Sequence, residues 1–253
     1  MGKNWLELLV ESGMTRFAAP PIAASPKLPR RSLLQALNQP GVRIIAEVKK
    51  RSPSAGVLRN PVEPAGLARA YQQGGAAAIS VVTEPQYFGG ASGWVAEVKH
   101  ATNLPVLQKD FFSRPEHLAH GLASGADAVL LIARMLPGAL LSEMVACCQE
   151  LGLEPLVETH DEEDVQRALD AGATLVGVNS RDLATFTVQV EAAAALVRGL
   201  PSGVVGVLES GVKDPGQFSQ LVAQGVRRFL IGEYLLRQNE PERALKELLE
   251  AQC

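Results

Sequence analysis

Charged residues close four short apolar runs in this sequence, and their types suit proton transfer. Glu47 and Lys49 end the first run, Lys109 the third, Glu158 the fifth and Glu209 the seventh. Glutamate and lysine act as general acids and bases, because neighbouring charge and desolvation can lower the pKa of a lysine or raise that of a glutamate. If the fold brings these side chains together, they form an acid–base site.

The sixth run ends in residues that suit the binding of a hydroxyl or an anion. Asn179 can orient a hydroxyl or a carboxylate, and Arg181 follows two positions later. A guanidinium can hold an anion through two parallel hydrogen bonds. The alternative for Arg181 is a surface salt bridge with its neighbour Asp182.

Glycines after the seventh and eighth runs indicate a phosphate site. Gly211 follows Ser210, and Gly232 precedes Glu233, where a short helix is expected to begin. Glycine turns expose backbone N–H groups, and such groups bind phosphate at a helix N-terminus. Ser52, in the loop after the first run, can add a hydroxyl.

Phe88 and two glycines follow the second run. They form either the edge of a lid that stacks on an aromatic substrate or an ordinary turn. The histidines and cysteines have no metal-ligand spacing, so we expect no metal site. Surface or helix-capping positions are expected for His117, His120 and His160.

Eight apolar runs, separated by stretches of helical periodicity, must position these side chains. Each run is apolar on both faces, as in a parallel sheet that helices cover. Eight such units in about 210 residues predict a (β/α)8 TIM barrel, an α/β fold. An open doubly wound sheet is the alternative, but its G-x-G-x-x-G turn is missing after the first run. The predicted strands are RIIAEV, AAISVV, LPVLQK, DAVLLIA, PLVE, TLVGVN, VVGVLE and RFLIG.

The entrances to these strands alternate in kind. Glycine after a helix suits a left-handed C-terminal cap, and proline is tolerated at the first residue of a strand. The chain therefore repeats a module of two strand–helix units four times. The glycines are Gly75, Gly125, Gly172 and Gly225, and the prolines are Pro40, Pro105, Pro155 and Pro201.

Such a barrel would gather the charged residues in one place. Active sites of these barrels lie at the C-terminal ends of the strands, and alternate strands contribute one layer of inward side chains. The charged residues all come from odd-numbered strands, so we expect them to converge. The alternative is a set of salt bridges that only closes the barrel, but a structural design would favour apolar residues there.

Residues 1–40 differ from the barrel domain at 41–253. Residues 4–14 can form an amphipathic helix, and four prolines predict an extended connector over 18–31. Ser32 is a suitable N-cap for a second short helix at 33–38. We therefore expect a helical extension on a single catalytic domain.

Composition and charge exclude several kinds of partner. The chain has 24 Lys and Arg against 27 Asp and Glu, a net charge of −3, so no basic field attracts nucleic acid or an anionic membrane. Apolar runs of about eight residues are too short to cross a bilayer. The charged N-terminus does not predict a signal peptide, and the cysteines predict a reduced, cytoplasmic protein.

In order and spacing, segments from about residue 41 to 240 resemble the motifs of the indole-3-glycerol phosphate synthase family. The segments are IIAEVKKRSPSAG, LPVLQKDFF, GADAVLLIARML, LVETHDEEDV, GVNSRDLATF, LESGV and FLIGEYLLR. The extension resembles that family's extra helices, which help cover the active site. The resemblance implies conversion of 1-(2-carboxyphenylamino)-1-deoxyribulose 5-phosphate to indole-3-glycerol phosphate in tryptophan biosynthesis, without a metal or an organic cofactor.

The resemblance also implies a role for each candidate residue. Lys109 would protonate the ribulose carbonyl, and Glu158 would be a general base, with Glu47 assisting dehydration. Lys49 would hold the anthranilate carboxylate, and a later role as an acid is left open for it. Which group serves which proton step stays open. The remaining residues would bind substrate. Its orientation would be set by Asn179, Glu209, Ser210 and Arg181. Its phosphate would be held by Ser52, Gly211, Gly232 and the N–H of Glu233, and its aromatic ring would contact Phe88 and Phe111.

Three positions depart from the family pattern. The family's F-x-G-S is Phe88-Gly89-Gly90-Ala91 here, which alters the expected lid. The last motif reads GEYLLR where GESLMR is commoner, so a serine contact is replaced while a backbone contact stays available. Leu208 is bulkier than the usual small residue.

Two other classes of function use the same residues. One is another phosphate-binding barrel enzyme, such as a sugar-phosphate isomerase or an aldolase that forms a Schiff base through Lys109. The other is a barrel that only binds a phosphorylated ligand or positions a partner enzyme, against which the complete acid–base set argues. The sequence does not identify a pathway enzyme as a partner.

Overall fold

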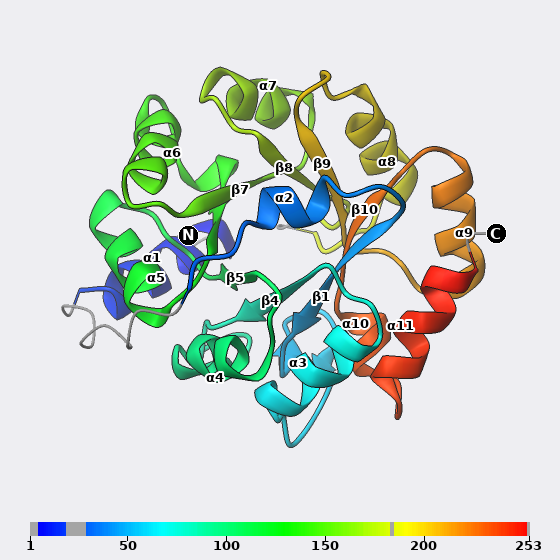
Figure 1. Cartoon of the computed structure of the whole chain (residues 1–253). Coiled ribbons are helices and arrows are strands. Elements are labelled where there is room, and N and C mark those ends of the chain that lie inside the picture. Colours follow the sequence, from blue (N-terminus) through cyan, green and yellow to red (C-terminus); the bar gives the residue numbers. More distant parts are fainter. Residues whose placement is uncertain (1–4, 19–28, 183–184, 252–253) are drawn as a thin grey trace.

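A closed barrel of eight parallel strands forms the centre of the molecule (Figure 1). A computed structural model describes residues 5–18, 29–182 and 185–251. Every barrel strand pairs with a neighbour on both sides, in the order β1-β10-β9-β8-β7-β6-β5-β4, which confirms the predicted (β/α)8 barrel and excludes an open sheet. The strands are β1 (Arg43–Val48), β4 (Ala78–Val82), β5 (Val106–Lys109), β6 (Ala128–Ile132), β7 (Glu154–Thr159), β8 (Leu175–Asn179), β9 (Val205–Glu209) and β10 (Arg228–Ile231).

Helices surround the barrel and bury the outer faces of its strands (Figure 1). They are α3 (Pro64–Gln73), α4 (Gly93–Ala101), α5 (Leu118–Ser124), α6 (Leu140–Glu150), α7 (Glu162–Asp170), α8 (Val190–Gly199), α9 (Pro215–Ala223), α10 (Glu233–Leu236) and α11 (Pro241–Glu250), with short 3-10 turns at Pro115–His117 and Ala133–Met135. A two-stranded hairpin, β2 (Arg51–Ser52) and β3 (Gly56–Val57), follows β1. Among the described residues, we find no helix with the length and apolarity needed to cross a membrane.

The predicted glycine caps adopt the left-handed conformation. Gly75, Gly125, Gly172 and Gly225 have φ between 79° and 102°, a region that side chains disfavour. Of the prolines, Pro105 directly precedes β5 and Pro155 is the second residue of β7. Pro40 and Pro201 stand three and four residues ahead of β1 and β9, so the proline signal marks those two entrances less closely.

The strand register brings the charged ends to the same height. Val82 of β4 is opposite Lys109 of β5, and Asn179 of β8 is opposite Glu209 of β9. Glu158 of β7 is opposite Gly177 of β8. Side chains from these C-terminal ends therefore surround one opening, which we call the mouth.

The two N-terminal helices lie at opposite ends of the barrel. α1 (Trp5–Arg16) borders the mouth, where Arg16 pairs with Asp110 just after β5. α2 (Leu33–Leu37) lies at the other end, across the barrel in the view of Figure 1. As predicted, Ser32 caps it and accepts a hydrogen bond from the Gln35 N–H. Most of the expected connector at 18–31 lies outside the described residues.

A buried ion pair fixes the chain ahead of α2. Lys99 donates to both carboxylate oxygens of Asp127, at 2.7 and 2.8 Å, and both side chains are almost completely buried. Asp127 also accepts a hydrogen bond from the Arg31 N–H, and the Pro29 carbonyl accepts one from Lys99. The pair therefore ties residues 29–31 to the N-terminal end of the barrel.

We expect Asp127→Ala to lower the free energy of unfolding by about 3–5 kcal/mol, because it leaves the Lys99 ammonium buried without its carboxylate. Urea denaturation followed by circular dichroism measures the change. Glu242→Ala removes an exposed ion pair with Lys246 and should cost less than about 1 kcal/mol. Equally small losses in the two variants would contradict the anchoring role of Asp127.

Candidate active site

A cavity of about 440 Å³ opens at the mouth. The fold brings the predicted site residues together around it, with the exception of Glu209. The predicted residues in its lining are Glu47, Lys49, Ser52, Phe88, Lys109, Phe111, Glu158, Asn179, Arg181, Ser210, Gly211, Gly232 and Glu233.

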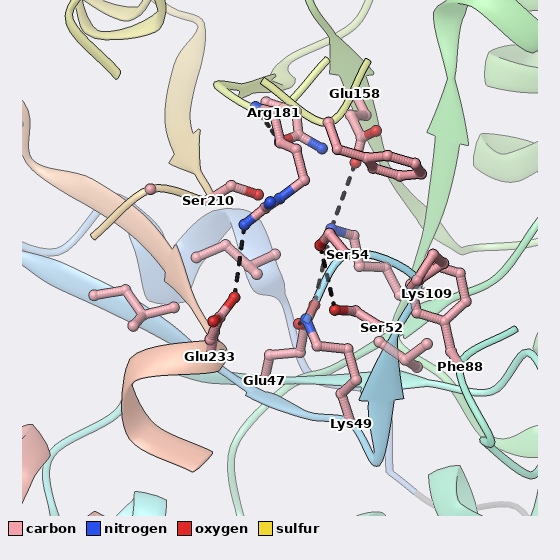
Figure 2. A pocket seen from close by; sticks show the side chains of 18 of the residues that line it. Glu47, Lys49, Ser52, Ser54, Phe88, Lys109, Glu158, Arg181, Ser210 and Glu233 are labelled. Carbon is pink, nitrogen blue, oxygen red and sulfur yellow. Dashed lines mark hydrogen bonds and ion pairs between the residues drawn. The ribbon is translucent and has the colours of Figure 1, made fainter. Parts of the chain in front are cut away.

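Lys109 lies among three carboxylates at the centre of the site. Its Nζ atom is 2.7 Å from Oε2 of Glu209, 3.4 Å from Oε2 of Glu158 and 3.8 Å from Oε2 of Glu47. The side chain of Lys109 is only 15% exposed. Figure 2 shows its ammonium pointing between Glu158 and Glu47. One cation therefore neutralises charge from three separate strands, β1, β7 and β9.

This arrangement keeps Lys109 protonated at neutral pH. Burial alone would lower the pKa of Lys109, but the carboxylates of Glu209, Glu158 and Glu47 raise it well above its ordinary value. The sequence allowed for a lysine with a lowered pKa, and the shift has the opposite direction at this position. Lys109 is thus a cation that can donate a proton to an oxygen on which negative charge develops.

The carboxylates around Lys109 differ in their affinity for protons. Burial raises the pKa of Glu209 to about 7, with Glu158 adding to the rise and Lys109 opposing it. Burial also opposes ionisation of Glu47, but Lys49 and Lys109 bring its pKa below the ordinary value. Glu158 likewise has a lowered pKa, because Lys109 and other partners outweigh its burial. At neutral pH, Glu47 and Glu158 are ionised and Glu209 is close to its midpoint.

Glu209 differs from the other candidates in its accessibility. It is completely buried and does not line the cavity, and it reaches the site only through Lys109. A Cβ atom on Gly177 of β8 would lie 2.0 Å from Oε1 of Glu209. The carboxyl group of Glu209 therefore occupies space that the missing side chain leaves open. Sequence reasoning missed Gly177, although a glycine inside an apolar strand is a known sign of close approach.

Gly232 makes room for a second carboxylate. A Cβ atom at this position would lie 2.5 Å from Oε1 of Glu47. Glu47 also forms an ion pair with Lys49, which Figure 2 shows. Gly232 therefore has a second role besides presenting its N–H at the start of α10. It leaves space for Glu47, which any side chain at this position would displace.

The anion-binding candidates all line the cavity at the mouth. Nη2 of Arg181 is 3.6 Å from Oε2 of Glu233 (Figure 2). Ser210 has a φ of 65°, which is uncommon for a residue with a side chain and frequent at functional sites. Ser52 lies on the hairpin after β1, where its Oγ accepts a hydrogen bond from the Ala55 N–H. These polar groups are available to a ligand in the cavity.

Aromatic side chains form part of the remaining wall. The rings of Phe88 and Phe111 have centroids 6.1 Å apart. The carboxylate of Glu84, which is completely buried, accepts hydrogen bonds from the backbone N–H groups of residues 86–88 and so fixes the loop that carries Phe88. Sequence reasoning missed Trp5 of α1, which lines the cavity and packs edge-on against Tyr87.

The interior of the barrel also contributes apolar lining that the search for charged residues passed over. Leu130 and Ile132 on β6 and Leu230 on β10 line the cavity. Their spacing in the sequence contained a usable signal, because residues two apart on a strand face the same side. The site thus combines charged groups from odd-numbered strands with an apolar surface from even-numbered ones.

An acid–base cluster and glycine turns at the C-terminal ends of a closed parallel barrel define a (β/α)8-barrel enzyme. The architecture is shared with thiamine phosphate pyrophosphorylase from Pyrococcus furiosus, with a TM-score of 0.63, 15% sequence identity and coverage of 87% of this chain and 97% of that one. At this identity the likeness concerns the fold alone.

Comparison of the sequence with known families identifies the family. Residues 12–248 match the model of the indole-3-glycerol phosphate synthase family. The indole-3-glycerol phosphate synthase of Syntrophobacter fumaroxidans is 43% identical over 225 residues, which cover 88% of this chain and 85% of that protein. The synthase of Mycobacterium ulcerans is 41% identical over 239 residues, with coverage of 94% and 87%. The chain belongs to the indole-3-glycerol phosphate synthase family, whose members are carboxy-lyases of tryptophan biosynthesis.

We expect Gly177→Ala to reduce kcat roughly 100-fold, because a new methyl group would displace Glu209 and thereby misplace Lys109. Steady-state kinetics of the family's reaction measure the loss, and thermal unfolding shows how much folded protein remains. Gly199→Ala is the matched control, since a Cβ atom there meets nothing within 4 Å. Full activity in Gly177→Ala would contradict the packing argument.

Proposed function

We propose that this chain converts 1-(2-carboxyphenylamino)-1-deoxyribulose 5-phosphate to indole-3-glycerol phosphate, with release of carbon dioxide and water. The position of Lys109 carries the proposal, because a protonated lysine between ionised carboxylates can both donate and recover protons. The names of the 41–43% identical relatives support this product.

The polar and aromatic lining supports a binding mode for each part of this substrate. In our proposal, the phosphate binds to Ser52, Gly211 and the N–H groups of Gly232 and Glu233. The aromatic ring packs against Phe88 and Phe111. Lys49 binds the anthranilate carboxylate. Asn179, Ser210 and Arg181 orient the sugar chain.

Ring closure is the first chemical step. The aromatic carbon that carries the carboxylate attacks the ketone carbon of the ribulose chain, and a carbon–carbon bond forms. The electron pair of the carbonyl moves to its oxygen, which takes a proton from the Lys109 ammonium. Proton donation by a positioned acid is typically worth about 10²–10⁴-fold in rate.

Decarboxylation and dehydration complete the indole ring. The bond to the carboxylate breaks, carbon dioxide leaves, and its electron pair restores the aromatic ring. The hydroxyl group then accepts a proton from Lys49 and leaves as water, while the ring nitrogen supplies the electron pair through the aromatic ring. Glu158, assisted by Glu47, takes the proton from the adjacent methylene carbon. A low pKa suits these two carboxylates for accepting protons.

Glu209 has a different role in this proposal from the one that the resemblance implies. A completely buried carboxyl group is in no position to orient a substrate directly. Its contact of 2.7 Å with Lys109 supports a positioning role, in which it fixes the ammonium and stabilises its charge. Its partial protonation near neutral pH suits a site whose net charge changes as protons move.

The alternative barrel enzyme, an aldolase that uses Lys109 as a nucleophile, is disfavoured by the charge of that residue. Formation of a Schiff base needs a neutral amine, and the surrounding carboxylates keep Lys109 protonated. Borohydride reduction in the presence of substrate would trap a Schiff base, and we expect no covalent adduct.

We further propose that residues 1–40 are an extension of a single catalytic domain at 41–253. The contacts of Trp5 and Leu9 with the cavity support a role for α1 in covering substrate. We propose the cytoplasm as the site of action, an inference that the free thiols of Cys147 and Cys148 support. The proposed binding partner is the small phosphorylated substrate.

We expect Lys109→Ala to reduce kcat by at least about 10²-fold while it retains binding of the phosphorylated product, because Lys109 is not among the proposed phosphate ligands. Fluorescence of indole-3-glycerol phosphate follows turnover, and calorimetry follows binding. Lys246→Ala, at an exposed position on α11, is the control for loss of a lysine. Absence of product formation by the folded wild-type protein would refute the proposed function.

We expect Ser52→Ala chiefly to raise KM, with a change in kcat of less than about twofold, because this hydroxyl would contact the phosphate and not the reacting carbons. Initial-rate measurements over a range of substrate concentrations separate the two constants. Ser124→Ala, in α5 and outside the cavity lining, is the control. An unchanged KM would remove Ser52 from the phosphate site.

A further inference from the structure

His160 occupies a buried position directly behind the mouth. It follows Glu158 by two residues at the end of β7, and its side chain is only 3% exposed. Nε2 lies 3.6 Å from Oε1 of Glu158, and Nδ1 lies 3.6 Å from Oδ2 of Asp164. This placement corrects the expectation of a surface or capping histidine, since the N-cap of α7 is Asp161.

The carboxylate behind His160 is firmly held. Asp164, in the first turn of α7, accepts hydrogen bonds from Nε of Arg134 at 2.8 Å and from the backbone N–H of His160 at 3.1 Å. Arg167 adds a cation at 3.8 Å. Burial opposes its charge, but His160 and Arg134 lower the pKa of Asp164 below the ordinary value. An ionised carboxylate therefore lies on the far side of the imidazole from the cavity.

Charged groups lie on both the cavity side and the far side of this imidazole. On the cavity side, Glu158 also faces Lys109 of β5 and Asn179 of β8. On the far side, Arg134 follows β6 and also pairs with Asp161 and Asp182. The result is a line of ionisable groups that runs from Lys109 through Glu158, His160 and Asp164 to Arg134.

His160 does not line the cavity, so it reaches the reaction only through Glu158. Among the residues that the structure describes, its two ring nitrogens have no hydrogen-bond partner at normal distance. Both nitrogens nevertheless point to carboxylate oxygens 3.6 Å away. A small movement of Glu158 toward the ring would complete a hydrogen bond, and so the ring limits where that carboxylate can rest.

We propose that His160 is a positioning residue that holds the Glu158 carboxylate from behind and, with Asp164, keeps it ionised for proton abstraction. The inference rests on the proposed role of Glu158 as the general base. It adds to the site a residue that touches neither the substrate nor the cavity.

The proposal fixes the direction of a pH effect. Burial raises the pKa of Glu158, and the charges of Lys109 and His160 lower it by more. Without His160, less charge offsets the effect of burial on Glu158, and so the pKa of Glu158 rises. A general base is inactive below its pKa, so the acidic limb of the kcat/KM profile moves to higher pH.

Two substitutions of His160 separate its effect on the position of the Glu158 carboxylate from its effect on the pKa of that carboxylate. We expect His160→Ala to lower kcat about tenfold or more and to move the acidic limb upward by about one pH unit. KM should change less than about twofold, because the cavity lining is intact. His160→Gln keeps a group that can hydrogen-bond to Glu158, so it should recover part of kcat while the acidic limb stays shifted. If His160→Ala does not fold, the test uses His160→Gln, and its result is the shift of the acidic limb alone.

His100→Ala, at an exposed position on α4, is the matched control and should leave the profile unchanged. Thermal unfolding of each variant gives the folded fraction. A loss of activity that tracks the folded fraction, with the acidic limb in its wild-type place, would overturn the proposal. Titration of ¹³C-labelled glutamate carboxyl groups by NMR measures the pKa of Glu158 without turnover. The inference therefore fails separately from the proposed function, which depends on product formation by the wild-type protein.

Discussion

The burial of the Lys109 ammonium among carboxylates is the interaction on which the site depends. Removing ions from water costs several kcal/mol each, and only close partners of opposite charge offset that cost. Lys109 has three such partners, and Glu47 has a second cation in Lys49. The barrel must therefore close completely, because the partners come from β1, β5, β7 and β9.

Close packing of ions demands space as well as charge. The strands between the charged ones supply that space through residues without side chains. Gly177 of β8 leaves room for the carboxyl group of Glu209, and Gly232 after β10 leaves room for Glu47. Even-numbered strands thus contribute glycines, apolar side chains and the neutral Asn179, and odd-numbered strands contribute the charges. The alternation that organises the barrel layers also organises the chemistry.

Much of this arrangement could be predicted from the sequence, because it follows a regular pattern. The eight apolar runs and their glycine and proline entrances fixed the barrel, and the charges at the ends of alternate runs fixed the mouth. It was harder to predict which end of the barrel α2 covers. α2 lies opposite the mouth because Ser32 and the Leu34 N–H bind Glu154 at the start of β7, a contact across more than one hundred residues.

The sequence also did not predict how deeply each site residue is buried. Glu47, Glu158 and Glu209 end their strands in the same way, yet of the three only Glu209 does not line the cavity, and its carboxyl group occupies the space that Gly177 of β8 leaves open. His160 next to Asp161 looked like a helix start, and only the fold shows the ring turned inward between two carboxylates. Both cases depend on contacts between strands or with a following helix, which a one-dimensional pattern does not contain.

Three glutamates of the same intrinsic acidity therefore become different groups. Glu47 has two cations beside it and stays ionised, whereas Glu209 has the deepest position and shares its cation with the others. Environments that move pKa values apart allow one site to hold proton donors and acceptors at a single pH. A reaction that closes a ring and then eliminates water needs both kinds of group in succession. The unequal charged neighbours of like residues, more than their number, are what suit this mouth to such a sequence of steps.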